Sequence, residues 1–190
     1  MSLYFLFTEV PQKKLQSKIT NTEKVLIGGP FVFKDSKGNI FDSEKKLHGK
    51  LRLVYFGFTY CPDVCPAALQ KISTLVDSLK GLGVDIVPIF ITIDPKRDTN
   101  EVLEDYMKNF HPDFISLTGD AEEIDRLAKL FKIYYKIAPS KEPNDKDYLI
   151  DHSVFIYLMD GDGKYLSHFD SSASEAETLN QLIKILRNNR

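Results

Sequence analysis

Residues 51–66 read LRLVYFGFTYCPDVCP, an apolar run that leads into two proline-flanked cysteines. The first part, Leu51–Phe58, is aromatic and nearly all apolar, a pattern typical of a strand buried on both faces of a sheet. Cys61 and Cys65 follow, and from there to Gly81 apolar residues recur at steps of three and four, which predicts a helix. We therefore expect a buried strand that turns directly into a cysteine-bearing helix.

Strands and helices alternate on both sides of this junction, which predicts an α/β fold with a mostly parallel sheet, helices on both faces and a closing antiparallel hairpin. Asp98, with Glu101 three residues later, is predicted to cap the helix after the second core strand. Asp160–Gly163 reads DGDG and predicts a hairpin turn rather than a calcium loop, because Lys164 stands where a ligand belongs. The expected elements are a hairpin over 31–41, strands over 84–93, 114–117, 154–159 and 165–169, and helices over 99–110, 121–131 and 174–188, with 133–150 irregular.

The charge balance and the number of cysteines exclude several classes of protein. The 190 residues include 25 Lys and Arg against 27 Asp and Glu, a net charge of −2, which argues against a nucleic-acid-binding protein. Two cysteines are too few for a multi-bridge secreted scaffold or a four-cysteine zinc site, but they suffice for one disulfide, one redox pair or two metal ligands. The length predicts one domain, which we assign to residues 28–190, preceded by a polar linker within residues 1–27.

Leu3–Phe7 is a short apolar run near the start of the chain. A transmembrane helix needs about 20 apolar residues, so this run alone cannot span a bilayer. Two interpretations remain open. The run is either a frayed hydrophobic end or the last turn of a truncated membrane anchor, for which its Tyr and Phe content would suit the membrane interface.

Cys61 and Cys65 lie at the predicted start of a helix, where backbone amides are unsatisfied and the helix dipole is positive. Both effects stabilise thiolates, so we expect a lowered pKa for both cysteines. The spacing puts both side chains on one helical face, within reach of a disulfide or a shared metal ion. A thioredoxin-like redox pair would have two intervening residues rather than three, and simple apolar packing is a further alternative. A peroxide-reducing redoxin is disfavoured because Thr59 stands two residues before Cys61 rather than three.

His152 offers a third ligand. It follows Asp151 and is expected to open a core strand near the cysteine-bearing helix. In thioredoxin-like folds a cis-proline usually occupies this place, whereas the nearest proline here is Pro143. Two thiolates and one imidazole form a soft donor set that suits Cu(I), with Cu(II) also compatible in charge, whereas zinc would want a fourth donor. The other histidines are expected to be structural or solvated: His48, His111 and His168.

Three segments together resemble the Sco/SenC family, the copper-binding thioredoxin-like proteins of cytochrome c oxidase assembly. They are Tyr55–Pro66 (YFGFTYCPDVCP), Phe90–Thr99 (FITIDPKRDT) and Asp151–Ser153 (DHS), and their order and separation match over about residues 28–188. Tyr60 departs from the family pattern, since many members have His there, but it is not a proposed ligand. The combination is far more specific than a pair of cysteines with three intervening residues.

The resemblance implies a thioredoxin-like mixed sheet flanked by helices, with an N-terminal β-hairpin extension. It implies copper ligation by Cys61, Cys65 and His152 and a metallochaperone rather than an enzyme, which would assist the CuA site on cytochrome c oxidase subunit II. The alternative is a thiol-disulfide oxidoreductase that reduces the cysteines of that site. A second copper carrier of the periplasm or intermembrane space is a further expected partner. Members are typically held by one N-terminal transmembrane helix, with the domain on the periplasmic or mitochondrial intermembrane-space side, which supports the anchor interpretation of Leu3–Phe7.

The segment 133–150 is long for a helix-to-strand connection, where about 2–6 residues are usual. It leads into His152 and is either an ordinary surface insertion or a segment that is mobile without metal. In the second case it would become ordered when His152 joins the cysteines.

Overall fold

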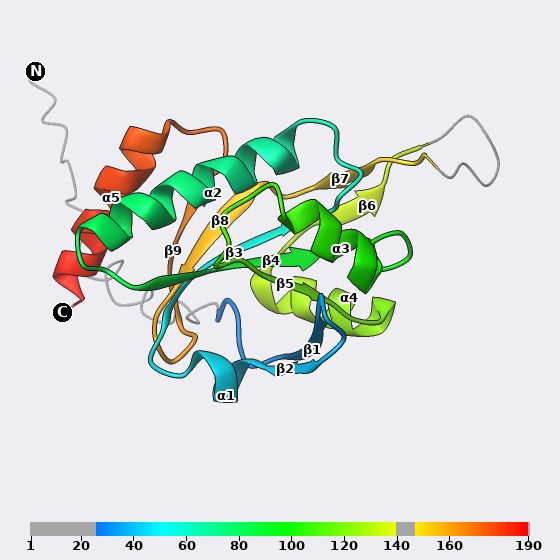
Figure 1. Cartoon of the computed structure of the whole chain (residues 1–190), viewed down its shortest axis with the longest axis horizontal. Helices are drawn as coiled ribbons and strands as arrows, with labels where there is room; N and C mark the ends of the chain where they lie inside the picture. Colours follow the sequence, from blue (N-terminus) through cyan, green and yellow to red (C-terminus); the bar gives the residue numbers. More distant parts are fainter. Residues whose placement is uncertain (1–25, 140–146, 190) are drawn as a thin grey trace, which may run out of the picture.

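The computed structural model describes residues 26–139 and 147–189 (Figure 1). The predicted anchor remnant Leu3–Phe7, nearly all of the predicted linker, and Pro143 lie outside these residues. The strands are β1 Val32–Asp35, β2 Ile40–Asp42, β3 Leu51–Gly57, β4 Ile86–Thr92, β5 Ile115–Thr118, β6 Tyr135–Ile137, β7 Ile150–His152, β8 Phe155–Met159 and β9 Tyr165–Asp170. The helices are α1 Ser43–Leu47, α2 Val64–Gly81, α3 Asn100–Met107, α4 Ala121–Phe131 and α5 Glu175–Asn188. None of the described helices is long and apolar enough to cross a membrane.

Seven strands form one mixed sheet in the order β2-β1-β5-β4-β3-β8-β9. Parallel pairing joins β3 to β4 and β4 to β5, while β1, β8 and β9 attach antiparallel. The α/β class and the closing hairpin are therefore as expected. The sheet is less parallel than the alternation of strands and helices predicted. The N-terminal hairpin adds two antiparallel strands to it, because β1 pairs with β5.

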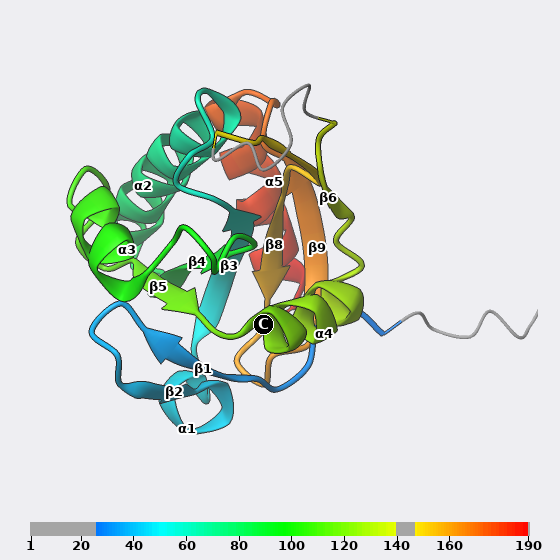
Figure 2. The ribbon, with the colours of Figure 1, turned by 90° about the vertical axis from the view of Figure 1, so that its right-hand side faces the viewer.

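The central strand β3 carries the core and leads to the cysteines. Its residues Leu53–Phe56 are at most 1% exposed, since helices cover both faces of the sheet. Figures 1 and 2 show α2 and α5 on one face and α4 on the other. Side chains alternate along a strand, so Phe56 packs on Phe131 of α4 with ring centroids 5.1 Å apart, while Tyr55 faces Cys65 of α2. The chain leaves this buried strand at the point where the cysteine loop begins.

Three local predictions were wrong. Thr99, not Asp98, caps α3, because its side chain accepts from the Val102 amide. The segment 133–150 is not wholly irregular, since it contains β6 and β7, which pair antiparallel in a separate two-stranded sheet. His152 is the last residue of β7 rather than the first of the following core strand. Figure 1 shows this hairpin projecting from the body of the molecule.

The DGDG sequence forms a turn, as predicted. The Asp160 carboxylate accepts hydrogen bonds from the backbone amides of Asp162 (2.9 Å) and Lys164 (2.8 Å), within its own turn. The turn is thereby closed by its own first residue, and it connects β8 to β9.

Candidate metal centre

The cysteine loop begins at Gly57, the last residue of β3, and ends where α2 starts. Cys61 is 8% exposed and Cys65 is fully buried, and neither forms a disulfide. Cys65 packs directly against the strand, because Gly57 has no side chain. A Cβ atom at Gly57 would lie 2.8 Å from the Cys65 sulfur, closer than such atoms approach in proteins. A glycine within an apolar strand is a signal of close backbone approach, and sequence reasoning overlooked it here.

His152 reaches this pair of cysteines from β7. Its Nε2 lies 3.5 Å from the Cys65 Sγ, and the donor atoms of His152, Cys61 and Cys65 all lie within 4.8 Å of one another. Within residues 26–139 and 147–189, these are the only three His, Cys, Asp or Glu side chains grouped closely enough to hold a metal ion. The three predicted site residues therefore come together, from two separate parts of the fold.

The His152 ring is oriented by its other nitrogen. Nδ1 lies 2.9 Å from the Ser153 carbonyl oxygen, which can only accept, so Nδ1 carries the ring proton. Nε2 then presents its lone pair to the sulfurs, which is the form that binds metals. Phe58 and Tyr55 contact the ring edge-on, with centroids 5.8 and 6.3 Å away. The Tyr55 hydroxyl also donates to the Cys65 Sγ at 3.8 Å.

The pKa values of the two thiols are shifted in opposite directions. A hydrogen bond from the Cys65 thiol lowers the pKa of Cys61 to about 4, with further help from backbone amides at the start of the helix. The Cys61 thiolate that results, together with complete burial, raises the pKa of Cys65. The expectation of a lowered pKa was correct for Cys61 and wrong for Cys65, because two adjacent thiols share one proton. A cation placed between them would favour the ionised form of both.

Asp98 supports the cysteine loop from behind. Its carboxylate is fully buried and accepts hydrogen bonds from the Thr59 amide (3.1 Å), the Thr59 hydroxyl (2.6 Å) and the Thr92 hydroxyl (2.5 Å). Burial raises the pKa of Asp98 despite these donors. This carboxylate therefore fixes the backbone two residues before Cys61, a role that its position before a helix did not indicate.

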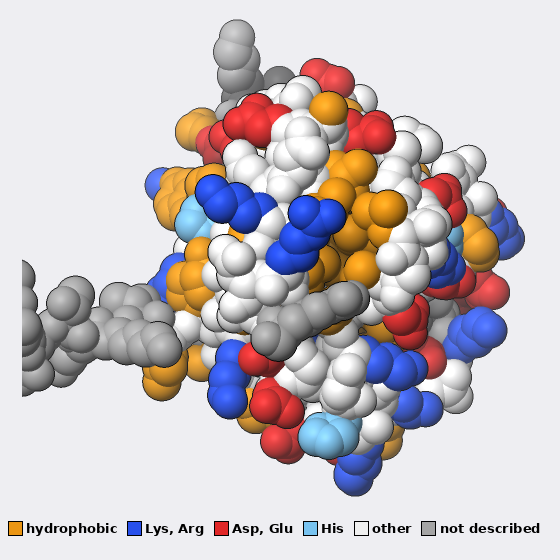
Figure 3. Space-filling view, turned by 90° about the vertical axis from the view of Figure 1, so that its left-hand side faces the viewer, with side chains coloured by type: hydrophobic (Ala, Val, Ile, Leu, Met, Phe, Trp, Pro, Cys, Tyr) orange, Lys and Arg blue, Asp and Glu red, His pale blue; other side chains and the backbone are white. Residues whose placement is uncertain are grey.

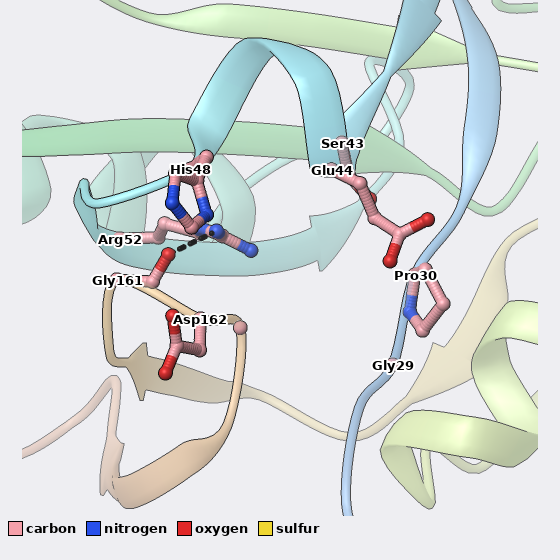
Figure 4. A pocket seen from close by; sticks show the side chains of 9 residues that line it. Gly29, Pro30, Ser43, Glu44, His48, Arg52, Gly161 and Asp162 are labelled. Atoms are coloured by element: carbon pink, nitrogen blue, oxygen red, sulfur yellow. Dashed lines mark hydrogen bonds between the residues drawn. The ribbon is translucent and has the colours of Figure 1, made fainter.

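The other histidines lie outside this group. His111 contacts Asp77 at 3.2 Å, and His168 contacts the Tyr165 hydroxyl at 2.5 Å. His48 is exposed and lines a separate cavity of about 260 Å³ beside α1 (Figure 4). These positions agree with the structural or solvated roles predicted for them.

Arg52 occupies the wall of that separate cavity. Its guanidinium donates to the carbonyl oxygens of Leu47 (2.8 Å) and Gly161 (3.1 Å), and Figure 4 shows the latter bond. It thereby joins the end of α1 to the turn between β8 and β9. Glu44 and His48 also line this cavity, but in Figure 4 their side chains point to different parts of it. The cavity is distant from the cysteine loop along β3.

Comparisons with known proteins agree with this geometry. A SCO2-like protein of Rickettsia prowazekii is 49% identical over 178 residues, which cover 92% of this chain and 86% of that protein. The mitochondrial SCO1 homolog of Homo sapiens is 38% identical over 171 residues, 89% of this chain and 56% of that protein. The crystal structure of Arabidopsis thaliana ScoI with copper bound is similar with a TM-score of 0.77 and 38% identity, over 85% of this chain and 99% of that chain.

These likenesses bear out the expected thioredoxin-like mixed sheet flanked by helices. A family model described as SCO1/SenC matches residues 19–187, nearly the whole chain. The chain is therefore a member of the SCO1/SenC family.

Proposed function

We propose that the protein is a copper metallochaperone of cytochrome c oxidase assembly, which binds copper through Cys61, Cys65 and His152. The observation that carries the proposal is the approach of two sulfurs and one imidazole nitrogen to within 4.8 Å of one another. Related proteins support it, since the ScoI proteins of Arabidopsis thaliana and Bradyrhizobium japonicum have solved structures with copper bound.

The donor set itself favours copper. Thiolates are soft ligands that select Cu(I), and a neutral imidazole completes a three-coordinate site. Cys65 must lose its proton when the metal binds, so binding releases a proton. The metal then takes the place of this proton between the two sulfurs. Zinc would require a fourth donor, and among the described residues no Asp, Glu or further His joins the group. Cu(II) is also compatible, because two thiolates balance its charge.

Copper would be passed on by ligand exchange at the exposed side of the site. Cys61 is the more accessible cysteine, and an exposed apolar side chain precedes each cysteine, Tyr60 (53% exposed) before Cys61 and Val64 (45% exposed) before Cys65. Exposed apolar side chains around a reactive centre are typical of a surface that contacts a protein partner. We propose that the recipient is the CuA site on cytochrome c oxidase subunit II, and that another periplasmic or intermembrane-space carrier supplies the copper.

Membrane attachment belongs to the same proposal. An N-terminal helix would hold the domain on the periplasmic or mitochondrial intermembrane-space side. The support comes from relatives, which include mitochondrial proteins of Homo sapiens and Saccharomyces cerevisiae. The oxidase is a membrane protein, so attachment would keep the domain close to its recipient.

Titration of Cu(I) against a competing chelator tests the ligand assignment. His152→Ala should weaken Cu(I) binding by at least about tenfold, because the metal loses one of three donors. His48→Ala is the matched control, since His48 is exposed at α1 and away from the sulfurs; it should bind like the wild type. If His152→Ala keeps full affinity, the assignment of this ligand is wrong.

The second candidate function is thiol-disulfide exchange, which the acidity of Cys61 favours. A pKa of about 4 keeps Cys61 as a thiolate near neutral pH. This thiolate would attack a partner's disulfide to form a mixed disulfide, and Cys65, after losing its proton, would then displace the partner's second thiol. The partner gains two electrons and the protein ends with a Cys61–Cys65 disulfide. Reduction of a disulfide form of the oxidase copper site by copper-free protein, unchanged in His152→Ala, would favour this function over copper delivery.

A further inference from the structure

Three residues outside the donor set form a buried cluster beside the cysteine loop. The Tyr148 hydroxyl donates to the Asp94 Oδ1 at 2.6 Å, and the Arg97 Nε contacts the Asp94 Oδ2 at 2.5 Å. The Arg97 guanidinium also stacks on the Tyr148 ring, 3.6 Å from its centroid. Asp94 is 3% exposed and Tyr148 is 9% exposed. We call Asp94, Arg97 and Tyr148 the Asp94 cluster.

The cluster matters because the main sheet does not hold His152. His152 ends β7, which pairs with β6 in the separate two-stranded sheet, with Tyr135 opposite His152. Further bonds join the two strands at the Ser153 end, where the Ser153 amide donates to the Tyr134 carbonyl at 2.9 Å. Tyr134 and Ile137 are 60% and 58% exposed, so much of this hairpin faces solvent. The main sheet holds the chain again from Phe155, where β8 begins, so the place of His152 over the sulfurs depends on that side and on how the start of β7 attaches to the body.

Tyr148 provides such an attachment. It lies two residues before the start of β7 and four before His152, and its hydroxyl bonds to a carboxylate that follows β4 in the main sheet. The same carboxylate holds Arg97, whose guanidinium lies 4.6 Å from the centroid of the Tyr60 ring in the cysteine loop. The cluster thus contacts both the strand that brings the imidazole and the loop that brings the first sulfur.

We infer that Tyr148, bonded to Asp94, is a positioning residue that sets the reach of His152 to the metal. This inference rests on the proposed copper site and adds a residue that touches neither the metal nor its ligands. The Tyr148–Asp94 hydrogen bond fixes the chain four residues before His152, so that little ordering remains to be done when the imidazole binds. Without that bond the two sulfurs would keep their geometry, and the imidazole would be the donor that loosens.

A double-mutant cycle tests this assignment. Cu(I) affinity would be measured by chelator competition for the wild type, Tyr148→Phe, His152→Ala and the double variant. Tyr148→Phe keeps the ring under Arg97 and removes only the hydroxyl. We expect about fivefold weaker binding for Tyr148→Phe in the wild-type background, the effect of one ordinary hydrogen bond, and no further loss in the His152→Ala background. Tyr134→Phe, exposed on the same hairpin, is the matched control and should bind like the wild type.

The outcomes separate this inference from the copper site itself. If His152→Ala binds Cu(I) as tightly as the wild type, the ligand assignment fails and the proposed site falls with it. If His152→Ala weakens binding but Tyr148→Phe has no effect, or has the same effect in both backgrounds, the ligand assignment stands and the positioning role is overturned. A general loss of fold stability would weaken binding equally in both backgrounds, so only a real coupling to His152 gives the expected pattern.

Discussion

At the scale of single residues, the site is prepared for metal by groups that do not bind it. The Ser153 carbonyl holds the proton of His152 on Nδ1, so Nε2 would need no tautomer change to bind a metal. The Tyr55 hydroxyl donates to the Cys65 sulfur, and a donated hydrogen bond stabilises a thiolate. The fully buried Asp98 fixes Thr59 within the cysteine loop, two residues before Cys61. These contacts hold the donor groups in place, so binding of a metal need reorganise few side chains.

Gly57 gives a prediction at this scale. A Cβ there would lie 2.8 Å from the Cys65 sulfur, 3.0 Å from the Phe90 ring and 3.1 Å from the Tyr55 ring. Gly57→Ala should therefore push the Cys65 sulfur away from β3, lower the free energy of unfolding by about 1–3 kcal/mol, and weaken copper binding. Urea denaturation and Cu(I) competition would measure the two effects.

The control for that variant is Gly81→Ala. A Cβ at Gly81, at the end of α2, would meet nothing within 4 Å. Alanine favours a helix over glycine by about 1 kcal/mol, so this variant should be as stable as the wild type or slightly more stable. Equal stability and equal copper affinity for Gly57→Ala and Gly81→Ala would contradict the close packing of the sulfur on the strand.

At the scale of elements, the site joins two parts of unequal rigidity. The cysteines come from the junction of β3 and α2, whose packed side chains are almost all buried. The imidazole comes from β7, a three-residue strand in a two-stranded sheet, and such short hairpins are marginally stable alone. A metal that bridges the two parts would tie the weaker one to the stronger one.

This difference predicts a change in hydrogen exchange on copper binding. Backbone amides of β6 and β7 should exchange more slowly in the Cu(I) form, because opening the hairpin would then break a metal–nitrogen bond. Amides of β3 should change little, since the core already protects them. Mass-spectrometric exchange of the copper-free and Cu(I) forms would measure both. Equal protection of β6 and β7 in the two forms would contradict the coupling.

The same contrast explains how much could be predicted from the sequence. The strand–cysteine–helix junction was predictable because its pattern is local and long enough to show a period, and α4 was predicted at Ala121–Phe131 as observed. Strands β6 and β7 were missed because three residues are too few to show alternation. The Asp98 side chain does not cap the helix that follows it but accepts a hydrogen bond from Thr59, which is 39 residues away. A contact over that separation depends on the tertiary fold and leaves no local sequence pattern.

The candidate ligands show the same limit. Cys61 and Cys65 were recognisable from their spacing at a helix start, and His152 from its residue type and from the family resemblance. Local reasoning assigned a lowered pKa to both thiols, yet burial and the neighbouring thiolate raise that of Cys65. The Tyr148–Asp94 bond spans 54 residues and left no local pattern in either segment.

At the scale of the whole molecule, positive and negative charges nearly balance, with 25 Lys and Arg against 27 Asp and Glu. Figure 3 shows the end away from the cysteine loop, where a patch of apolar side chains lies among charges of both signs. Its mixed charges, like the net charge of −2, provide no single-signed field to steer a partner. At the metal end, the exposed apolar side chains of Tyr60 and Val64 beside the two cysteines in sequence are groups available for contact with a partner.

Val64 tests whether those contacts serve copper transfer. It is 45% exposed at the first position of α2, where an acidic residue suits the helix dipole, so Val64→Asp should fold normally and keep its ligands. We expect about tenfold slower transfer of copper to the soluble domain of oxidase subunit II, because a buried charge would disfavour the complex. Val102→Asp is the matched control, since Val102 is 40% exposed in the first turn of α3 and should leave transfer unchanged. Stopped-flow transfer rates at equal copper loading would measure both, and equal slowing by the two variants would mean that the partner does not dock on the apolar side chains around Cys61.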